Sequence, residues 1–250
     1  MKKLLYLLIL SIITSMSFSV MTVRAESSGY YTYSINEDGA SCTITRYDGA
    51  GRDVIIPDSL DGYKTTAIGE QAFLASSRSL TRVTIPDGVT VIGGGAFAMC
   101  RELTHVTIPE SVTTIGRIAF AGCSKLENLA IPEGVSSIGN GAFQSCSKLK
   151  SLTIPEGITV IGDDLLSGCT GLTSFTISEN IEKIGIRAFS NSGLVSISIP
   201  ESVTEIGESA FAYCREPESI SILGKIKTIK DRTFENCVKL NSVTIPGSVT

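Results

Sequence analysis

The stretch Arg101–Cys123, RELTHVTIPESVTTIGRIAFAGC, contains the pattern from which most of the chain is built. Its Ile-Pro pair at Ile108-Pro109 recurs 23 residues earlier and 23 and 46 residues later, and its Ile-Gly pair and its cysteine recur at the same interval. A fixed period between about 20 and 50 residues is typical of solenoids made of stacked repeats. The sequence therefore predicts one elongated domain in which each repeat stacks on the next.

One repeat has a simple predicted structure. Val106 and Ile108 lie two residues apart and so share one face of a short strand, while Thr107 points to the other face. Pro109 ends the strand because it cannot donate to a ladder of hydrogen bonds. The Ala-Phe-x-x-Cys motif at 119–123 falls at helical offsets, which predicts a short helical turn. A single repeat buries too little to fold alone, so we expect parallel pairing between neighbouring strands.

The order L-x-x-V-x-I-P, V-x-x-I-G and A-F-x-x-C resembles the bacterial surface leucine-rich repeats called BspA-like or Treponema-type. The resemblance covers about residues 30–250 and extends to the whole 23-residue frame. It implies a curved, right-handed leucine-rich-repeat solenoid of α/β repeats, with a parallel β-sheet on the concave face and short helical turns on the other. It also implies adhesion to proteins of host or neighbouring cells.

Residues 1–25 are interpreted as a secretory signal peptide. Lys2-Lys3 precede the apolar run Leu4–Val20, and the small residues at positions 23 and 25 predict cleavage before Glu26. An uncleaved N-terminal anchor is the alternative, because the apolar run approaches the length of a membrane span. Either reading predicts a secreted or surface-displayed protein.

Two further segments follow the signal. Residues 26–55 do not fit the repeat and predict a small N-terminal β cap, with a hairpin turn at 36–39. Capping of the first coil is the main interpretation of its tyrosines, and ligand binding by them is the alternative. Residues 56–250 predict an array of about 23 residues per repeat whose last repeat is incomplete. We interpret the sequence as a fragment, and a natural end that another chain completes is the alternative.

The charge balance argues against some partners. The formal net charge is −4, and the first 25 residues hold three of the 21 bases and no acid, so the remainder has 18 bases against 25 acids, or −7. A nucleic-acid partner would call for a basic patch. We therefore expect no nucleic acid, and membrane contact only through the N-terminal signal or anchor.

The cysteines recur in one slot of the repeat, which predicts a packing role. Metal sites draw on close pairs such as Cys-x-x-Cys, and the sequence has none. Cysteines that point in parallel from neighbouring repeats are poorly placed for disulfides. We interpret the column as small buried apolar side chains, with Cys42 outside it as a candidate free thiol, and we leave disulfide formation open. The column consists of Cys100, Cys123, Cys146, Cys169, Cys214 and Cys237.

No enzymatic chemistry is predicted. The sequence has one histidine, His105, and no G-x-S-x-G elbow, phosphate loop or H-E-x-x-H motif. The acids that recur after the Ile-Pro pairs are interpreted as solvated turn residues. We expect no catalytic site, no cofactor and no metal.

The candidate binding site is the exposed side of the predicted strands. Outward residues of successive repeats should form polar ladders there, although threonine also favours strands for intrinsic reasons. A broad, flat, hydrogen-bonding surface suits an extracellular protein or glycan better than a small molecule. The predicted site on the concave face consists of Arg82, Thr84, His105, Thr107, Asn128, Ser151, Thr153, Ser174, Thr176, Ser196 and Ser198.

Three functions are compatible with this pattern. The favoured one is adhesin-like recognition of proteins by the strand face. The alternative is a structural spacer that binds nothing and presents another domain. Ice binding is a weaker third, because serine and alanine interrupt the threonine column.

Overall fold

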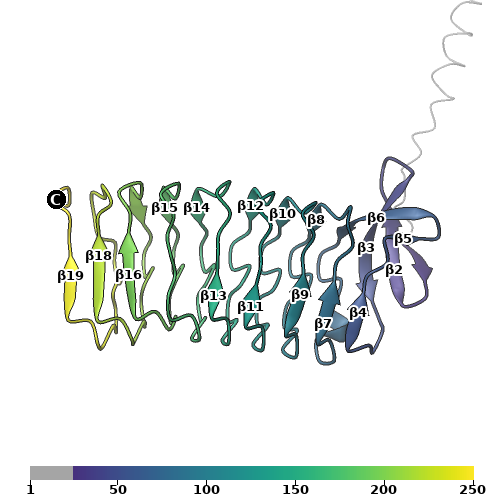
Figure 1. Cartoon of the computed structure of the whole chain (residues 1–250), viewed down its shortest axis with the longest axis horizontal. Helices are drawn as coiled ribbons and strands as arrows, with labels where there is room; N and C mark the ends of the chain where they lie inside the picture. Colours follow the sequence, from purple (N-terminus) through teal and green to yellow (C-terminus); the bar gives the residue numbers. More distant parts are fainter. Residues whose placement is uncertain (1–24) are drawn as a thin grey trace, which may run out of the picture.

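The computed structural model describes residues 25–250, and these form a single row of stacked coils. Figure 1 shows the coils side by side along the long axis, with the N-terminal strands at one end and the last coil at the other. Nearly all of the expected signal peptide lies outside the described residues. Among residues 25–250 there is no helix of the length and apolarity needed to cross a membrane.

One set of parallel strands, here called the front ladder, corresponds to the predicted strands of the repeat. Its strands pair within three sheets, β4-β7-β9, β11-β13 and β16-β18-β19. Equivalent repeat positions pair directly, as in Arg82 with His105 and Val83 with Val106. The front ladder consists of β4 (Asp53–Ile55), β7 (Arg82–Thr84), β9 (His105–Thr107), β11 (Asn128–Leu129), β13 (Ser151–Leu152), β16 (Ser196–Ile199), β18 (Ser219–Ile222) and β19 (Ser242–Thr244).

A second set of short parallel strands, the back ladder, ends at the Ile-Gly pair of each repeat. Most coils therefore contribute two strands, where the sequence predicted one; residues 173–177 and 228–229 form no strand at the equivalent positions. Ile92, Ile115 and Ile138 pair in register across three coils. The back ladder consists of β6 (Tyr63–Ile68), β8 (Val91–Ile92), β10 (Thr114–Ile115), β12 (Ser137–Ile138), β14 (Val160–Ile161), β15 (Lys183–Ile184) and β17 (Glu205–Ile206).

The first end of the stack carries an antiparallel arrangement of β1 (Ala25–Ser28), β2 (Tyr31–Ile35) and β3 (Ser41–Tyr47). Strand β3 pairs in parallel with β6, so this sheet continues the back ladder. Strand β5 (Ser59–Leu60) adds an antiparallel edge to β6. The ring of Tyr47 lies 5.1 Å from that of Phe73, which joins the N-terminal strands to the core of the array.

The predicted helical turns are wrong. The helix of residues 25–250 is a single 3-10 turn, η1 (Leu74–Ser76), and the Ala-Phe-x-x-Cys segments are chains of tight turns. In the segment at 118–123, Ile118 and Gly122 have φ of 49° and 74°, which an α-helix does not allow. Backbone N–H groups alternate there: those of 119, 121 and 123 bond three residues back, and those of 118, 120 and 122 bond to the next coil. This sharing between coils replaces the helical pattern.

The core is a stack of equivalent side chains. Phe73, Phe97, Phe120 and Phe143 are fully buried, and successive ring centroids are 4.8, 5.3 and 6.1 Å apart. Leu166 takes the aromatic position in the next coil, where the stack is interrupted. The predicted equivalence of inward positions is therefore confirmed for these residues.

The Ile-Gly glycines are required by close contact between coils. Gly116 does not have a positive φ, so a tight turn is not its reason. A Cβ atom on Gly116 would lie 2.6 Å from the carbonyl carbon of Gly93 in the preceding coil. The same close approach to the preceding backbone recurs at Gly93, Gly139, Gly185 and Gly207.

Candidate functional site

The structure places all eleven predicted strand-face residues at the surface. Eight of them lie on strands of the front ladder, and Thr153, Ser174 and Thr176 lie in the corresponding extended segments between strands. Register pairing brings Arg82 beside His105. We call this surface the front strand face.

The polar groups of the front strand face are only partly engaged with each other. Nδ1 of His105 lies 2.9 Å from Oγ1 of Thr104, and Oγ of Ser151 donates to Oδ1 of Asn128 at 3.4 Å. Their remaining donors and acceptors point to solvent, where they can bond a partner.

Ion pairs border the front strand face between successive coils. Nζ of Lys125 lies 2.6 Å from Glu102, and Nζ of Lys150 lies 2.7 Å from Glu127. The hydrogen bond from Lys150 and its charge lower the pKa of Glu127. These exposed pairs fix side-chain positions at the border and contribute little to stability.

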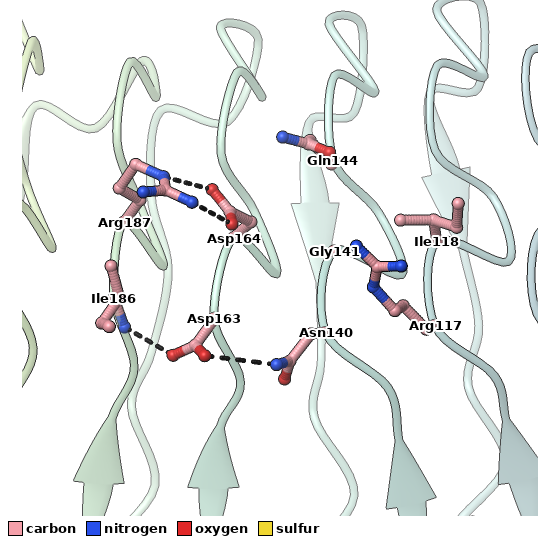
Figure 2. Close-up of a pocket in the computed structure, with 9 residues that line it drawn as sticks. All are labelled: Arg117, Ile118, Asn140, Gly141, Gln144, Asp163, Asp164, Ile186 and Arg187. Atoms are coloured by element: carbon pink, nitrogen blue, oxygen red, sulfur yellow. Dashed lines mark hydrogen bonds and ion pairs between the residues drawn. The ribbon is translucent and has the colours of Figure 1, made fainter.

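Sequence reasoning missed a second site, a polar groove of about 270 Å³ that begins just after the back-ladder strands β10, β12, β14 and β15. Figure 2 shows that its residues come from four neighbouring coils. The residue after each Ile-Gly pair supplies one wall, with Arg117, Asn140 and Asp163 on three successive coils. We call it the rim groove.

Hydrogen bonds hold one side of the rim groove in place. Arg187 binds Asp164 through two parallel bonds, Nε to Oδ1 and Nη2 to Oδ2, both 2.8 Å long. Asp163 accepts one bond from the backbone N–H of Ile186 at 2.7 Å and one from Nδ2 of Asn140 at 3.2 Å. These contacts hold both carboxylates in fixed positions (Figure 2).

Gly141 is one of the residues that line the groove. Successive coils place a left-handed residue at this point, with Ile118 before it and Asp164 after it. Gly141 has no side chain and is buried, and its neighbours leave little room for one. A Cβ atom there would lie 3.1 Å from Cγ2 of Ile118 and 3.6 Å from Oε1 of Gln144.

The cysteines are all free thiols in the described structure, and six of the seven are buried, including Cys42. Sγ of Cys123 donates to the carbonyl of Phe97 in the preceding coil at 3.3 Å, and Cys146 repeats this contact with Phe120. Burial raises the pKa of Cys146 to about 12. The column packs the core and satisfies backbone carbonyls. Within residues 25–250, no three His, Cys, Asp or Glu residues are grouped to hold a metal.

Comparison with known sequences agrees with this architecture. The family model described as "BspA type Leucine rich repeat region (6 copies)" matches residues 66–194 and 146–250. The chain belongs to the BspA-type leucine-rich-repeat family. The resemblance predicted from the repeat frame is thereby confirmed, whereas no curated protein matches the sequence.

Solved structures show the same fold. A leucine-rich cell-surface protein from Faecalibacterium prausnitzii is 31% identical with a TM-score of 0.78, covering 90% of this BspA-type chain and 71% of that one. A leucine-rich repeat protein from Bacteroides ovatus is 26% identical with a TM-score of 0.55, covering 90% and 77%. The pneumococcal vaccine antigen PcpA, 16% identical with a TM-score of 0.64 over 91% and 71% of the two chains, shares the fold.

Proposed function

We propose that this BspA-type protein is a secreted or cell-surface module that binds an extracellular protein, as an adhesin does, through its front strand face. The cell-surface description of the Faecalibacterium relative supports the location. The N-terminal signal predicted for residues 1–25 supports it independently.

One observation carries the choice of surface. Eleven polar residues, contributed one or two at a time by successive coils, are all exposed along the front ladder. Neighbouring parallel strands lie about 4.8 Å apart, so these residues form rows of evenly spaced donors and acceptors. A partner with an extended or flat surface can bond several coils at once, and the total affinity grows with the number of coils engaged.

Arg82 and His105 supply the basic side chains of this surface, which can bind an acidic group of a partner. They lie side by side on β7 and β9, at the N-terminal part of the ladder. An arginine side chain can bond a carboxylate through two parallel contacts, which fixes the orientation of a partner. The other nine residues of the predicted site are uncharged and suit complementarity more than strong attraction.

The test is a binding comparison on immobilised extracellular-matrix proteins by surface plasmon resonance. The front variant combines Arg82→Ala, His105→Ala and Thr107→Ala, and the proposal expects at least about tenfold weaker binding. The matched control combines Thr90→Ala, Thr113→Ala and Ser136→Ala, which are exposed hydroxyl residues beside the back ladder. The control should bind like the unaltered protein.

Two results would count against the proposal. Equal loss in both variants would move the binding surface away from the front strand face. Failure of the unaltered protein to bind any member of the panel would favour the structural-spacer function instead.

A further inference from the structure

The rim groove has the features of a ligand site that is separate from the front strand face. It lies after the back ladder, whereas the proposed protein-binding surface lies on the front ladder. Four adjacent coils form the groove, and they differ at the position that follows the Ile-Gly pair. The residues at this position are Arg117, Asn140, Asp163 and Ile186. We propose that this groove binds a carboxylate-bearing sugar residue of a glycan.

Arg117, rather than the net charge of the lining, favours an anionic group, because the two arginines of the groove are balanced by two aspartates. Arg187 is paired with Asp164, and both oxygens of Asp163 already accept hydrogen bonds. The guanidinium of Arg117 lines the groove and has no hydrogen-bond or ion-pair partner within the described part of the chain. A carboxylate is the planar acceptor that a guanidinium binds through two parallel bonds.

The remaining polar groups select a hydroxylated ligand. The amide of Gln144 makes no hydrogen bond with other described residues and supplies one donor group and one acceptor. Oδ1 of Asn140, which lies against Gly162, is a second acceptor without a hydrogen bond there. The carboxylates of Asp163 and Asp164 keep lone pairs that can accept further bonds. Sugar hydroxyls both donate and accept, so a surface of mixed donors and acceptors suits them.

The shape of the groove agrees with a single sugar residue. Its volume is about 270 Å³, and the aliphatic side chain of Ile118 lines it beside Gly141. A second aliphatic side chain, that of Ile186, lies near the Asp163 end (Figure 2). Such groups can contact the C–H face of a pyranose ring. An acidic peptide could also reach Arg117 and bond the amides through its backbone, so poly-glutamate is included as a comparison ligand.

The acceptor groups of the rim groove are held in position by hydrogen bonds within the protein. The two bonds to Asp163 and the paired bonds between Arg187 and Asp164 fix the acceptors without help from a ligand. Little conformational entropy then has to be lost on binding, which favours affinity.

The experiment is isothermal titration calorimetry of the protein with uronic-acid and sialic-acid oligosaccharides, at a fixed salt concentration. Arg117→Gln removes the unpaired charge at an exposed position, and we expect it to weaken binding by about 10- to 100-fold. Gln144→Ala removes the amide that the proposal assigns to a sugar hydroxyl, and we expect it to weaken binding by about 3- to 10-fold. Arg101→Gln is the matched control, because Arg101 is an exposed arginine on the same coil as Arg117 but outside the groove. It should bind as the unaltered protein does.

Four outcomes would overturn the proposal. These are no binding to any oligosaccharide of the panel, equal binding of carboxyl-reduced oligosaccharides, equal binding of poly-glutamate, and equal loss in the Arg101→Gln control. The front variant with Arg82, His105 and Thr107 replaced should retain sugar binding, and the groove variants should retain binding to a protein partner. Failure of either proposal is therefore visible without the other.

Discussion

Replacing Gly116 by alanine tests whether the coils are packed as closely as the structure places them. The added Cβ atom would lie 2.6 Å from the carbonyl carbon of Gly93, 2.6 Å from the nitrogen of Gly94 and 3.0 Å from the oxygen of Gly93. All three are backbone atoms, so no side chain can rotate to make room. The Gly116 N–H also donates to the carbonyl of Ile92 at 2.7 Å, and the coils must separate at this bond to accept the methyl group.

The expected cost has two parts. Forcing a methyl group into a packed interior costs about 1–3 kcal/mol. Weakening one backbone hydrogen bond between coils costs about 1 kcal/mol more. We therefore expect Gly116→Ala to lower the free energy of unfolding by about 2–4 kcal/mol. The effect should extend to both neighbouring coils, because repeats in a solenoid depend on their interfaces.

The assay is urea unfolding followed by circular dichroism, with Gly157→Ala as the control. A Cβ atom at Gly157 would lie 3.6 Å from the oxygen of Val135 and 3.9 Å from Cα of Ser136, which are ordinary contacts, and Gly157 has no positive φ. The control should therefore be neutral or stabilising by up to about 1 kcal/mol, because alanine restricts the unfolded chain. Equal unfolding midpoints for the two variants would refute the close-packing argument.

Three further predictions concern the thiols and the ion pairs. With a thiol-modifying reagent at pH 8, the half-buried Cys237 should react before the other column cysteines, which are buried; labelling followed by mass spectrometry measures the order. Burial raises the pKa of Cys100 and Cys146 from 9.0 to about 12, so above pH 9 the unfolded chain loses protons that the folded chain keeps. The free energy of unfolding should therefore fall as the pH rises from 9, and urea unfolding between pH 8 and 11 measures this fall. Glu102→Gln should change the free energy of unfolding by less than about 1 kcal/mol, since both partners of the Glu102–Lys125 pair are exposed; a larger loss in urea unfolding would contradict this.

The period of the sequence predicts the arrangement of the core because stacking makes every repeat the neighbour of an equivalent repeat. Phe97, Phe120 and Phe143 then have to meet, and they do, as fully buried stacked rings. The alternation of Val106, Thr107 and Ile108 likewise predicts which strand residues face solvent, and Thr107 is exposed. These features follow from local spacing and the repeat alone.

The turn segments could not be predicted in the same way. The spacing of Ala119, Phe120 and Cys123 fits a helical turn, and it fits a chain of tight turns equally well. Hydrogen bonds to the next coil decide between the two, since they take every second N–H that a helix would use. They even hold Ile118, a β-branched residue, at a φ of 49°, where its intrinsic preference alone would not place it.

The two candidate sites differ in predictability for a related physical reason. The front strand face repeats one position of the coil, so a single alternating pattern reveals it. The rim groove depends instead on variation at the position after the Ile-Gly pair. On successive coils this position is occupied by Gly94, Arg117, Asn140, Asp163 and Ile186. Such positions tolerate variation because they neither fill the core nor approach the preceding backbone, as the phenylalanines and the Ile-Gly glycines do. In a solenoid the regular positions build the coil, and the surface positions that differ between coils are free to specify a ligand.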